Sequence, residues 1–161
     1  MKEQSKKGII KAGWLLFYIY IISLCYFLFF SEYYGRDYIS ENYRYNLELL
    51  KEIKRFIRYR EILGLENFVV NILGNILAFA PLGFLLPLLD QKYRKFYRMA
   101  ILSLLFSLLV EVVQLLLKVG IFDVDDLLLN TLGGMLGYVV CRLYMRLFVR
   151  LKRKQKTNRR K

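Results

Sequence analysis

Long apolar blocks alternate with short charged segments along this chain. The blocks cover residues 12–30, 68–89, about 97–117 and about 127–148. A helix of about 20 residues, rising about 1.5 Å per residue, spans the hydrocarbon core of a bilayer. The pattern therefore predicts four membrane helices in one domain, residues 12–149, followed by a basic tail at 150–161. The first block is too long for a removable signal peptide and should remain as a helix.

Residues 32–66 form the one long segment between blocks. Within it, apolar side chains recur at helical spacing, and Lys51, Glu52, Lys54, Arg55 and Arg58 fill the opposite face. The apolar set is Leu49, Leu50, Ile53, Phe56 and Ile57. This pattern predicts an amphipathic helix at the membrane surface. Either it packs on its own membrane bundle, or it binds a separate partner.

The distribution of charge orients the helices. The chain has a net charge of +13 and a mean hydropathy of +0.32. Lys and Arg are in excess in residues 1–11, in residues 90–98 and from Arg142 onward, whereas residues 32–66 carry seven basic and seven acidic groups. By the positive-inside rule, both termini and the 90–98 loop are cytoplasmic, and segment 32–66 is extracellular. This distribution favours anionic membrane lipids over nucleic acid as the partner of the basic groups.

Two prolines and two cysteines lead to further predictions about the helices. Pro81 and Pro87 predict a kink or a break in the second helix, because proline removes a backbone hydrogen bond. Cys25 and Cys141 lie at opposite depths in the predicted topology, which argues against a disulfide. The chain has no histidine, so the commonest general base near neutral pH is missing.

Polar side chains recur at one depth of three predicted helices, in the outer half of the membrane. Charges and amides in such a place are costly, which makes them candidates for a functional site. One of the three aspartates at its start, with Asp125 and Asp126 as the named candidates, is expected to cap the fourth helix. Gly133 and Gly137 are spaced to let two helices approach closely. The candidate polar site consists of Asn71, Asn75, Glu111, Gln114, Asp123, Asp125, Asp126 and Asn130.

Glu111 is the most costly of these groups, because it lies within an apolar run two turns from the outer end of its helix. A structural interpretation gives it a hydrogen bond to Asn71, Asn75 or Asn130. A functional interpretation makes it part of a site for a headgroup, a cation or a proton. The carboxylates are ligands suited to Ca²⁺ or Mg²⁺, but their spacing matches no metal loop. No metal or cofactor is expected.

Three blocks of this polar pattern resemble the VanZ family of membrane proteins. The resemblance covers about residues 40–140 and includes the residues Asn71, Asn75, Pro81 and Gly83 of the second helix and the pair Glu111 and Gln114 of the third. The last block is the run Asp123-Val124-Asp125-Asp126-Leu127-Leu128-Leu129-Asn130-Thr131-Leu132-Gly133-Gly134. Two features depart from the family pattern: no Pro-Phe follows Asn46-Leu47-Glu48, and Gly120-Ile121 stands where many members have an arginine.

The resemblance implies low-level resistance to teicoplanin-type lipoglycopeptides in the cell membrane of a Gram-positive bacterium. Its expected partners are membrane lipids and a lipid-linked cell-wall precursor or the lipoglycopeptide itself. The first hypothesis is therefore a non-enzymatic protein that acts on such a molecule at the outer leaflet. The second is a membrane enzyme in which Glu111 and Asp126 perform acid/base chemistry on a lipid-linked substrate. The third is a small lipid transporter that uses the intramembrane Glu111.

Overall fold

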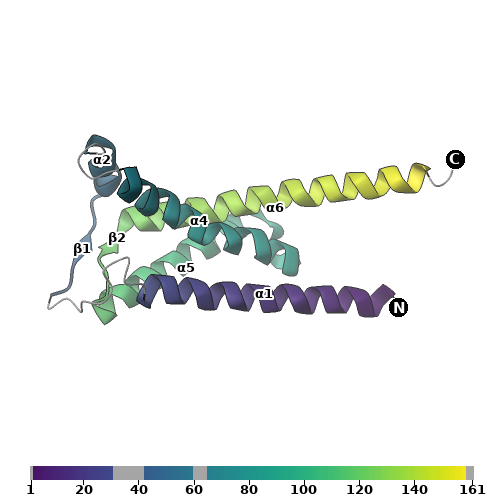
Figure 1. Ribbon diagram of the computed structural model, residues 1–161, viewed down its shortest axis with the longest axis horizontal. Helices are drawn as coiled ribbons and strands as arrows, with labels where there is room; N and C mark the ends of the chain where they lie inside the picture. Colours follow the sequence, from purple (N-terminus) through teal and green to yellow (C-terminus); the bar gives the residue numbers. More distant parts are fainter. Residues whose placement is uncertain (1, 31–41, 60–64, 159–161) are drawn as a thin grey trace.

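Four long helices make up most of the protein, as the hydropathy pattern predicts. The structure, a computed structural model, describes residues 2–30, 42–59 and 65–158. Each of the four helices contains a stretch of 21 to 29 residues that is long and apolar enough to cross a membrane. The two termini lie at the same end of the molecule, as an even number of crossings requires (Figure 1). The helices are α1 (Lys2–Phe30), α4 (Leu65–Leu89), α5 (Phe96–Leu117) and α6 (Val124–Asn158).

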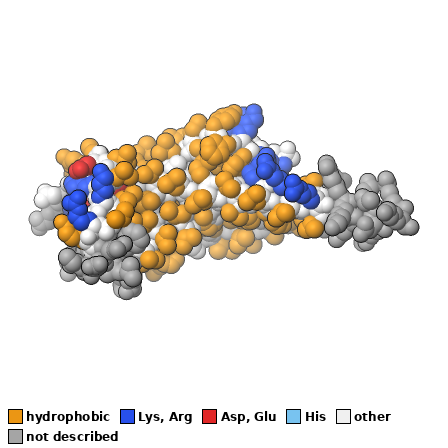
Figure 2. Space-filling model, turned by 90° about the horizontal axis from the view of Figure 1, so that it is seen from above, with side chains coloured by type: hydrophobic (Ala, Val, Ile, Leu, Met, Phe, Trp, Pro, Cys, Tyr) orange, Lys and Arg blue, Asp and Glu red, His pale blue; other side chains and the backbone are white. Residues whose placement is uncertain are grey.

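The outside of this bundle is apolar. Figure 2 shows hydrophobic side chains over the middle of the molecule, with charged side chains gathered towards its two ends. Large side chains such as Ile22 (69% exposed) and Leu77 (67% exposed) project outward from the helices. In water such a surface would be strongly unfavourable, whereas lipid tails are a suitable neighbour for it. The fold is therefore that of an all-α membrane protein.

Short elements close the end of the bundle opposite the termini. They are the helix α2 (Lys51–Arg58) and two strands of two residues each, β1 (Tyr45–Asn46) and β2 (Phe122–Asp123). The strands pair in parallel, Tyr45 with Phe122 and Asn46 with Asp123. We call this end the α2 end. Helix α2 is the predicted amphipathic helix, and the strand pair is an addition that the sequence did not indicate; residues 31–41 and 60–64 of the predicted outer segment lie outside the described residues.

Helices α4 and α6 touch through their backbones. A Cβ atom added to Gly83 would overlap the carbonyl oxygen of Gly134, and one added to Gly137 would overlap that of Ala80. Gly133 meets the backbone of Ile76 in the same way. The predicted role of Gly133 and Gly137 in close helix packing is confirmed. Beside this contact lies the core, which α5 completes and which consists of Phe79, Leu82, Leu86, Met99, Val110 and Tyr138.

Helix α1 packs much more loosely. Only 6% of its apolar stretch is buried, against 28% for each of the other three helices. Two hydrogen bonds to other helices hold it: Tyr20 Oη donates to the Ala78 carbonyl oxygen (2.8 Å), and Gln114 Nε2 donates to the Leu28 carbonyl oxygen (2.8 Å). Leu28 lies in the last turn of α1, where carbonyl groups have no partner within the helix. Gln114 therefore caps α1 from α5.

Helix α4 continues without a break through Pro81 and Pro87 to Leu89. The predicted break is therefore absent, because neighbouring groups in a bundle tolerate the lost backbone hydrogen bond. Pro81 cannot donate to the carbonyl of Leu77, four residues earlier. One turn before Pro81, the Ala78 carbonyl accepts the hydrogen bond from Tyr20 that ties α1 to this part of α4.

The turn from α4 to α5 is a short 3₁₀ helix, η2 (Gln91–Arg94), capped by Asp90, whose Oδ1 accepts from the Lys92 N–H (2.8 Å). Arg94 Nε donates to the Pro87 carbonyl (3.0 Å), and Tyr138 Oη donates to the Arg94 carbonyl (2.7 Å). These bonds fasten the basic 90–98 loop to α6 at the terminal end.

Two further expectations concern single groups and the chain end. Cys25 and Cys141 are free thiols, which confirms that they form no disulfide. The basic tail expected to begin at residue 150 continues α6 as a helix as far as Asn158.

Candidate functional site

The eight predicted site residues lie at four places near the α2 end. Asn71, Asn75 and Asp126 line a cavity. Asp123, Asp125 and Glu111 form a buried carboxylate cluster where α6 begins. Gln114 caps α1, as described above, and Asn130 Nδ2 donates to Ser107 Oγ (2.9 Å) between α6 and α5. The constellation predicted as one site is thus one cavity and three structural contacts around it.

The cavity has a volume of about 440 Å³ and lies between α1 and α4, with Asp126 of α6 contributing to its wall. Asn75 Nδ2 donates to Asp126 Oδ1 at 2.5 Å, so the amide of α4 and the carboxylate of α6 form one polar group. Asn71 lies one turn before Asn75 on α4 and lines the same cavity, because residues four apart share a helix face. Gly74, between them, also lines it.

The α1 wall of the cavity was not predicted from the sequence. It contributes two hydroxyl groups, from Tyr20 and Ser23, and the apolar side chains of Leu24, Phe27 and Leu28. A serine or tyrosine in an apolar block is common and bears no signal of its own. Only the position of α1 beside α4 shows that these hydroxyls belong with the amides. The lining thus combines polar groups with apolar side chains, and Leu77, Ala78 and Pro81 of α4 complete it.

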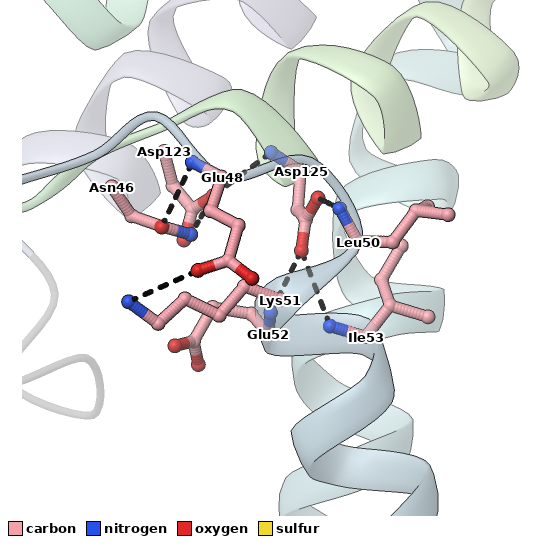
Figure 3. A network of polar contacts seen from close by, with 8 residues as sticks. All are labelled: Asn46, Glu48, Leu50, Lys51, Glu52, Ile53, Asp123 and Asp125. Carbon is pink, nitrogen blue, oxygen red and sulfur yellow. Dashed lines mark hydrogen bonds and ion pairs between the residues drawn. The ribbon is translucent and has the colours of Figure 1, made fainter.

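Asp125 is not among the described residues that line the cavity, and it caps helix α2 (Figure 3). Its carboxylate accepts hydrogen bonds from the backbone N–H groups of Leu50, Glu52 (2.9 Å) and Ile53 (3.2 Å). The residue at the N-cap position of α2 is Leu50, which has no side-chain acceptor and a positive φ of 64°. Helix N-termini carry unpaired donors and partial positive charge, and a carboxylate satisfies both. Asp125, 1% exposed, therefore supplies from α6 the cap that α2 lacks.

Asp123 caps α6 itself. One of its carboxylate oxygens accepts from the Asp125 N–H (2.8 Å) and from Asn46 Nδ2 (3.1 Å). The prediction that one of the three aspartates caps this helix is confirmed, but the cap is Asp123 and not the named candidates Asp125 and Asp126, because α6 already begins at Val124. Burial, as the largest cause, raises the pKa of the Asp123 carboxyl, although its hydrogen bonds oppose that shift. The Asn46 contact also holds β1 against β2 (Figure 3).

Glu111 fastens the end of α5 to the start of α6. Its side chain is 2% exposed, and Oε2 accepts a hydrogen bond from the Asp123 backbone N–H (3.1 Å). A backbone donor is thus a partner of this carboxylate, whereas the sequence suggested the amides of Asn71, Asn75 or Asn130. Glu111 is not among the described residues that line the cavity.

The chemistry of the cavity favours binding. Its polar wall offers a carboxylate, two amides and two hydroxyls, which can accept and donate several hydrogen bonds at once. Across the described ranges, no three Asp, Glu, Cys or His side chains are grouped so as to hold a metal ion. A lining that combines polar and apolar groups suits an amphiphile, which has both a headgroup and hydrocarbon.

Fold and cavity together define a small multi-pass α-helical membrane protein with a cavity of mixed polar and apolar lining near one end. Within that class, the chain belongs to the VanZ/LLP1 family, whose model matches residues 17–147. This match confirms the resemblance drawn from the polar motifs. No curated protein and no solved structure is detectably similar to the chain.

Proposed function

We propose that this VanZ-family protein binds the headgroup of a lipid or a lipid-linked cell-wall precursor at the outer leaflet of a Gram-positive cell membrane. By doing so it lowers susceptibility to teicoplanin-type lipoglycopeptides. The observation that carries the proposal is the cavity between α1 and α4, in which Asn71, Asn75 and Asp126 face apolar side chains of both helices. The family membership supports the link to lipoglycopeptides.

The orientation in this proposal comes from the charges. The terminal end carries the basic 90–98 loop and the basic end of α6, so the positive-inside rule places it in the cytoplasm. The α2 end, with the cavity near it, then faces outward. This is the side on which lipid-linked precursors are used and on which a lipoglycopeptide acts.

The contacts of Glu111 weigh against the enzyme hypothesis. That hypothesis pairs Glu111 with Asp126, but Glu111 binds the backbone at Asp123 while Asp126 lines the cavity and accepts from Asn75. A general acid or base has to reach the reacting group of a bound substrate. A binding role uses the cavity without requiring Glu111 to reach it.

The test compares susceptibility to teicoplanin and vancomycin in a sensitive Gram-positive host that expresses the wild type or a variant. Asn75→Leu removes the hydrogen bond to Asp126 and makes the polar wall apolar, whereas Asn42→Leu makes the same exchange at an exposed position outside the cavity. We expect the wild type and Asn42→Leu to protect against teicoplanin several-fold and Asn75→Leu to lose protection, at matched amounts in the membrane.

Full protection by Asn75→Leu would contradict the proposal. Glu111→Gln, tested in parallel, separates the alternatives. If it abolishes protection, and the mass of a lipid or precursor changes only when the wild type is expressed, the enzyme hypothesis replaces the binding hypothesis. If precursor chemistry is the same in all strains, binding is supported.

A further inference from the structure

The described wall of the cavity includes an acidic side chain but no basic one, in a strongly basic protein. The chain has 26 Lys and Arg residues against 13 Asp and Glu residues. Among the described residues of the cavity wall, however, Asp126 is the one with a formal charge at neutral pH, and no Lys or Arg is present. A ligand group that enters this cavity meets the half-buried carboxylate of Asp126. The energy of such an encounter depends strongly on the sign of the ligand charge, because charges interact strongly away from bulk water.

The cavity lining also offers several oxygen atoms that can accept hydrogen bonds. A carboxylate can accept up to about four hydrogen bonds, of which the bond from Asn75 is one at Asp126. Ser23 and Asn71 add further oxygen acceptors to the same wall. A primary ammonium carries three N–H donors and no acceptor, which this set of oxygens can satisfy.

Aromatic rings contribute from the α1 side. Phe27 and Tyr20 both line the cavity, and ring faces attract cations, most strongly where water is excluded. The apolar part of the wall, formed by Leu24, Leu28 and Leu77 among others, suits a hydrocarbon chain. A phosphate without a neighbouring cationic group would instead meet the Asp126 carboxylate, at a cost in both repulsion and desolvation.

We propose that the cavity selects a lipid whose headgroup carries a primary ammonium, with Asp126 as the group that recognises its charge. This inference rests on the proposed function, because it names the class of lipid that the same cavity binds. It predicts that headgroup charge, rather than headgroup size, decides affinity.

The first experiment uses the full-length wild type in detergent micelles and needs no variant. Calorimetric titration compares short-chain phosphatidylethanolamine with its N-acetylated derivative, which keeps the phosphate and the chains but lacks the positive charge. Short-chain phosphatidylglycerol and the chain-free headgroup glycerophosphoethanolamine complete the series. We expect the ammonium lipid to bind at least about tenfold more tightly than each of the others, a difference of about 1.4 kcal/mol.

A matched pair of variants then assigns the preference to Asp126. Asp126→Asn removes the charge and keeps the shape of the side chain. Glu48→Gln removes one negative charge at the same end of the molecule, from a side chain that is 72% exposed, pairs with Lys51 and does not line the cavity. The preference for the ammonium lipid should disappear in Asp126→Asn and remain in Glu48→Gln.

Several results would overturn the inference. Equal binding of the ammonium lipid and its acetylated form by the wild type would do so, even if Asp126→Asn failed to fold. Equal binding of the chain-free headgroup would show a soluble amine site instead of a lipid site. If Asn75→Leu abolished drug protection but the wild type showed no headgroup preference, only this inference would fail. If Asn75→Leu protected fully, the proposed function would fail, whatever the titrations showed.

Discussion

Helix α6 and helix α1 are both packed against α4, but by different means. Along α6, glycines bring backbone against backbone, and a single added Cβ atom would overlap a carbonyl oxygen. Along α1, large aromatic side chains and two hydrogen bonds to other helices make the contact, and the 440 Å³ cavity lies at this side. In lipid, where apolar surface gives no drive for association, close packing by small residues supplies much of the stability. We therefore interpret α4, α5 and α6 as a fixed frame and α1 as the wall that yields to a ligand.

The largest expected effect concerns the close backbone contact between α4 and α6. Gly83→Ala should destabilise the bundle by more than about 3 kcal/mol, because its Cβ would meet the Gly134 backbone, which has no flexible end to move aside. Unfolding in mixed micelles measures the change in free energy.

The matched control is the same exchange on α1. At Gly13 the added Cβ would meet Leu89 Cδ2, the far end of a flexible side chain, at 2.5 Å. Gly13→Ala should therefore cost well under half as much as Gly83→Ala. Similar losses for both variants would refute the distinction between frame and wall.

The next prediction concerns the Asp125 carboxylate, which caps α2 from α6. Asp125→Ala leaves the N–H groups of Leu50, Glu52 and Ile53 without their carboxylate, and should destabilise α2 locally by about 2 kcal/mol. Hydrogen exchange of the amides in α2 should speed up accordingly, while exchange in α6 beyond its first turns stays slow. Asp125→Asn, which retains one acceptor oxygen, should give a smaller loss; unchanged exchange in Asp125→Ala would show that the cap is dispensable.

A smaller effect is expected from the hydrogen bonds that hold α1 to the other helices. Removing these two hydrogen bonds with Tyr20→Phe and Gln114→Leu should cost about 0.6 kcal/mol each, the average for such bonds in membranes. If the losses add, separation of α1 becomes about eightfold easier. The two free cysteines give the readout, because Cys25 lies on α1 and Cys141 is fully buried on α6. A lipophilic maleimide should label Cys25 faster in the double variant and Cys141 at its original rate. Equal acceleration at both would mean that the whole bundle has loosened.

The smallest effect concerns pH and the α6 cap. Because burial raises the pKa of Asp123, the folded protein holds a proton at this group at pH values where the unfolded chain has lost it. Its contribution to stability is therefore complete below the ordinary pKa of aspartate and is lost as the pH rises through the raised pKa. Lowering the pH from neutral into that range should increase the free energy of unfolding, and Asp123→Asn should reduce the dependence. A wild type and variant with the same pH profile would contradict this assignment.

The helices and their order could be predicted from the sequence because membrane hydropathy is a local signal. The apolar blocks gave the four spans, and the spacing of Gly133 and Gly137 gave the close packing. The start of α6 is predicted about one turn too late, because Asp123, Asp125 and Asp126 are polar and yet belong to the helix and its cap. Polarity ends a hydropathy signal but does not end a helix.

The grouping of the candidate residues could not be predicted, because depth along a helix does not tell which neighbour a side chain faces. Asp125 and Asp126 are adjacent in sequence, but successive residues on a helix point about 100° apart. One therefore caps α2 while the other lines the cavity. Asn71 and Asn75 were recognised as a pair, but Ser23 and Tyr20, on a different helix, were not.

The cap on α2 also has a consequence for the order in which the protein is made. Asp125 follows the backbone groups that it caps by 72 to 75 residues, and α4 and α5 lie between them. At the usual pace of synthesis, about 5–20 residues per second, α2 waits roughly 4 to 15 seconds for that carboxylate to leave the ribosome. During this interval the outer segment has been made but its helix start is unpaired. The chain thus fastens the segment between its first two membrane helices with a residue at the start of its fourth.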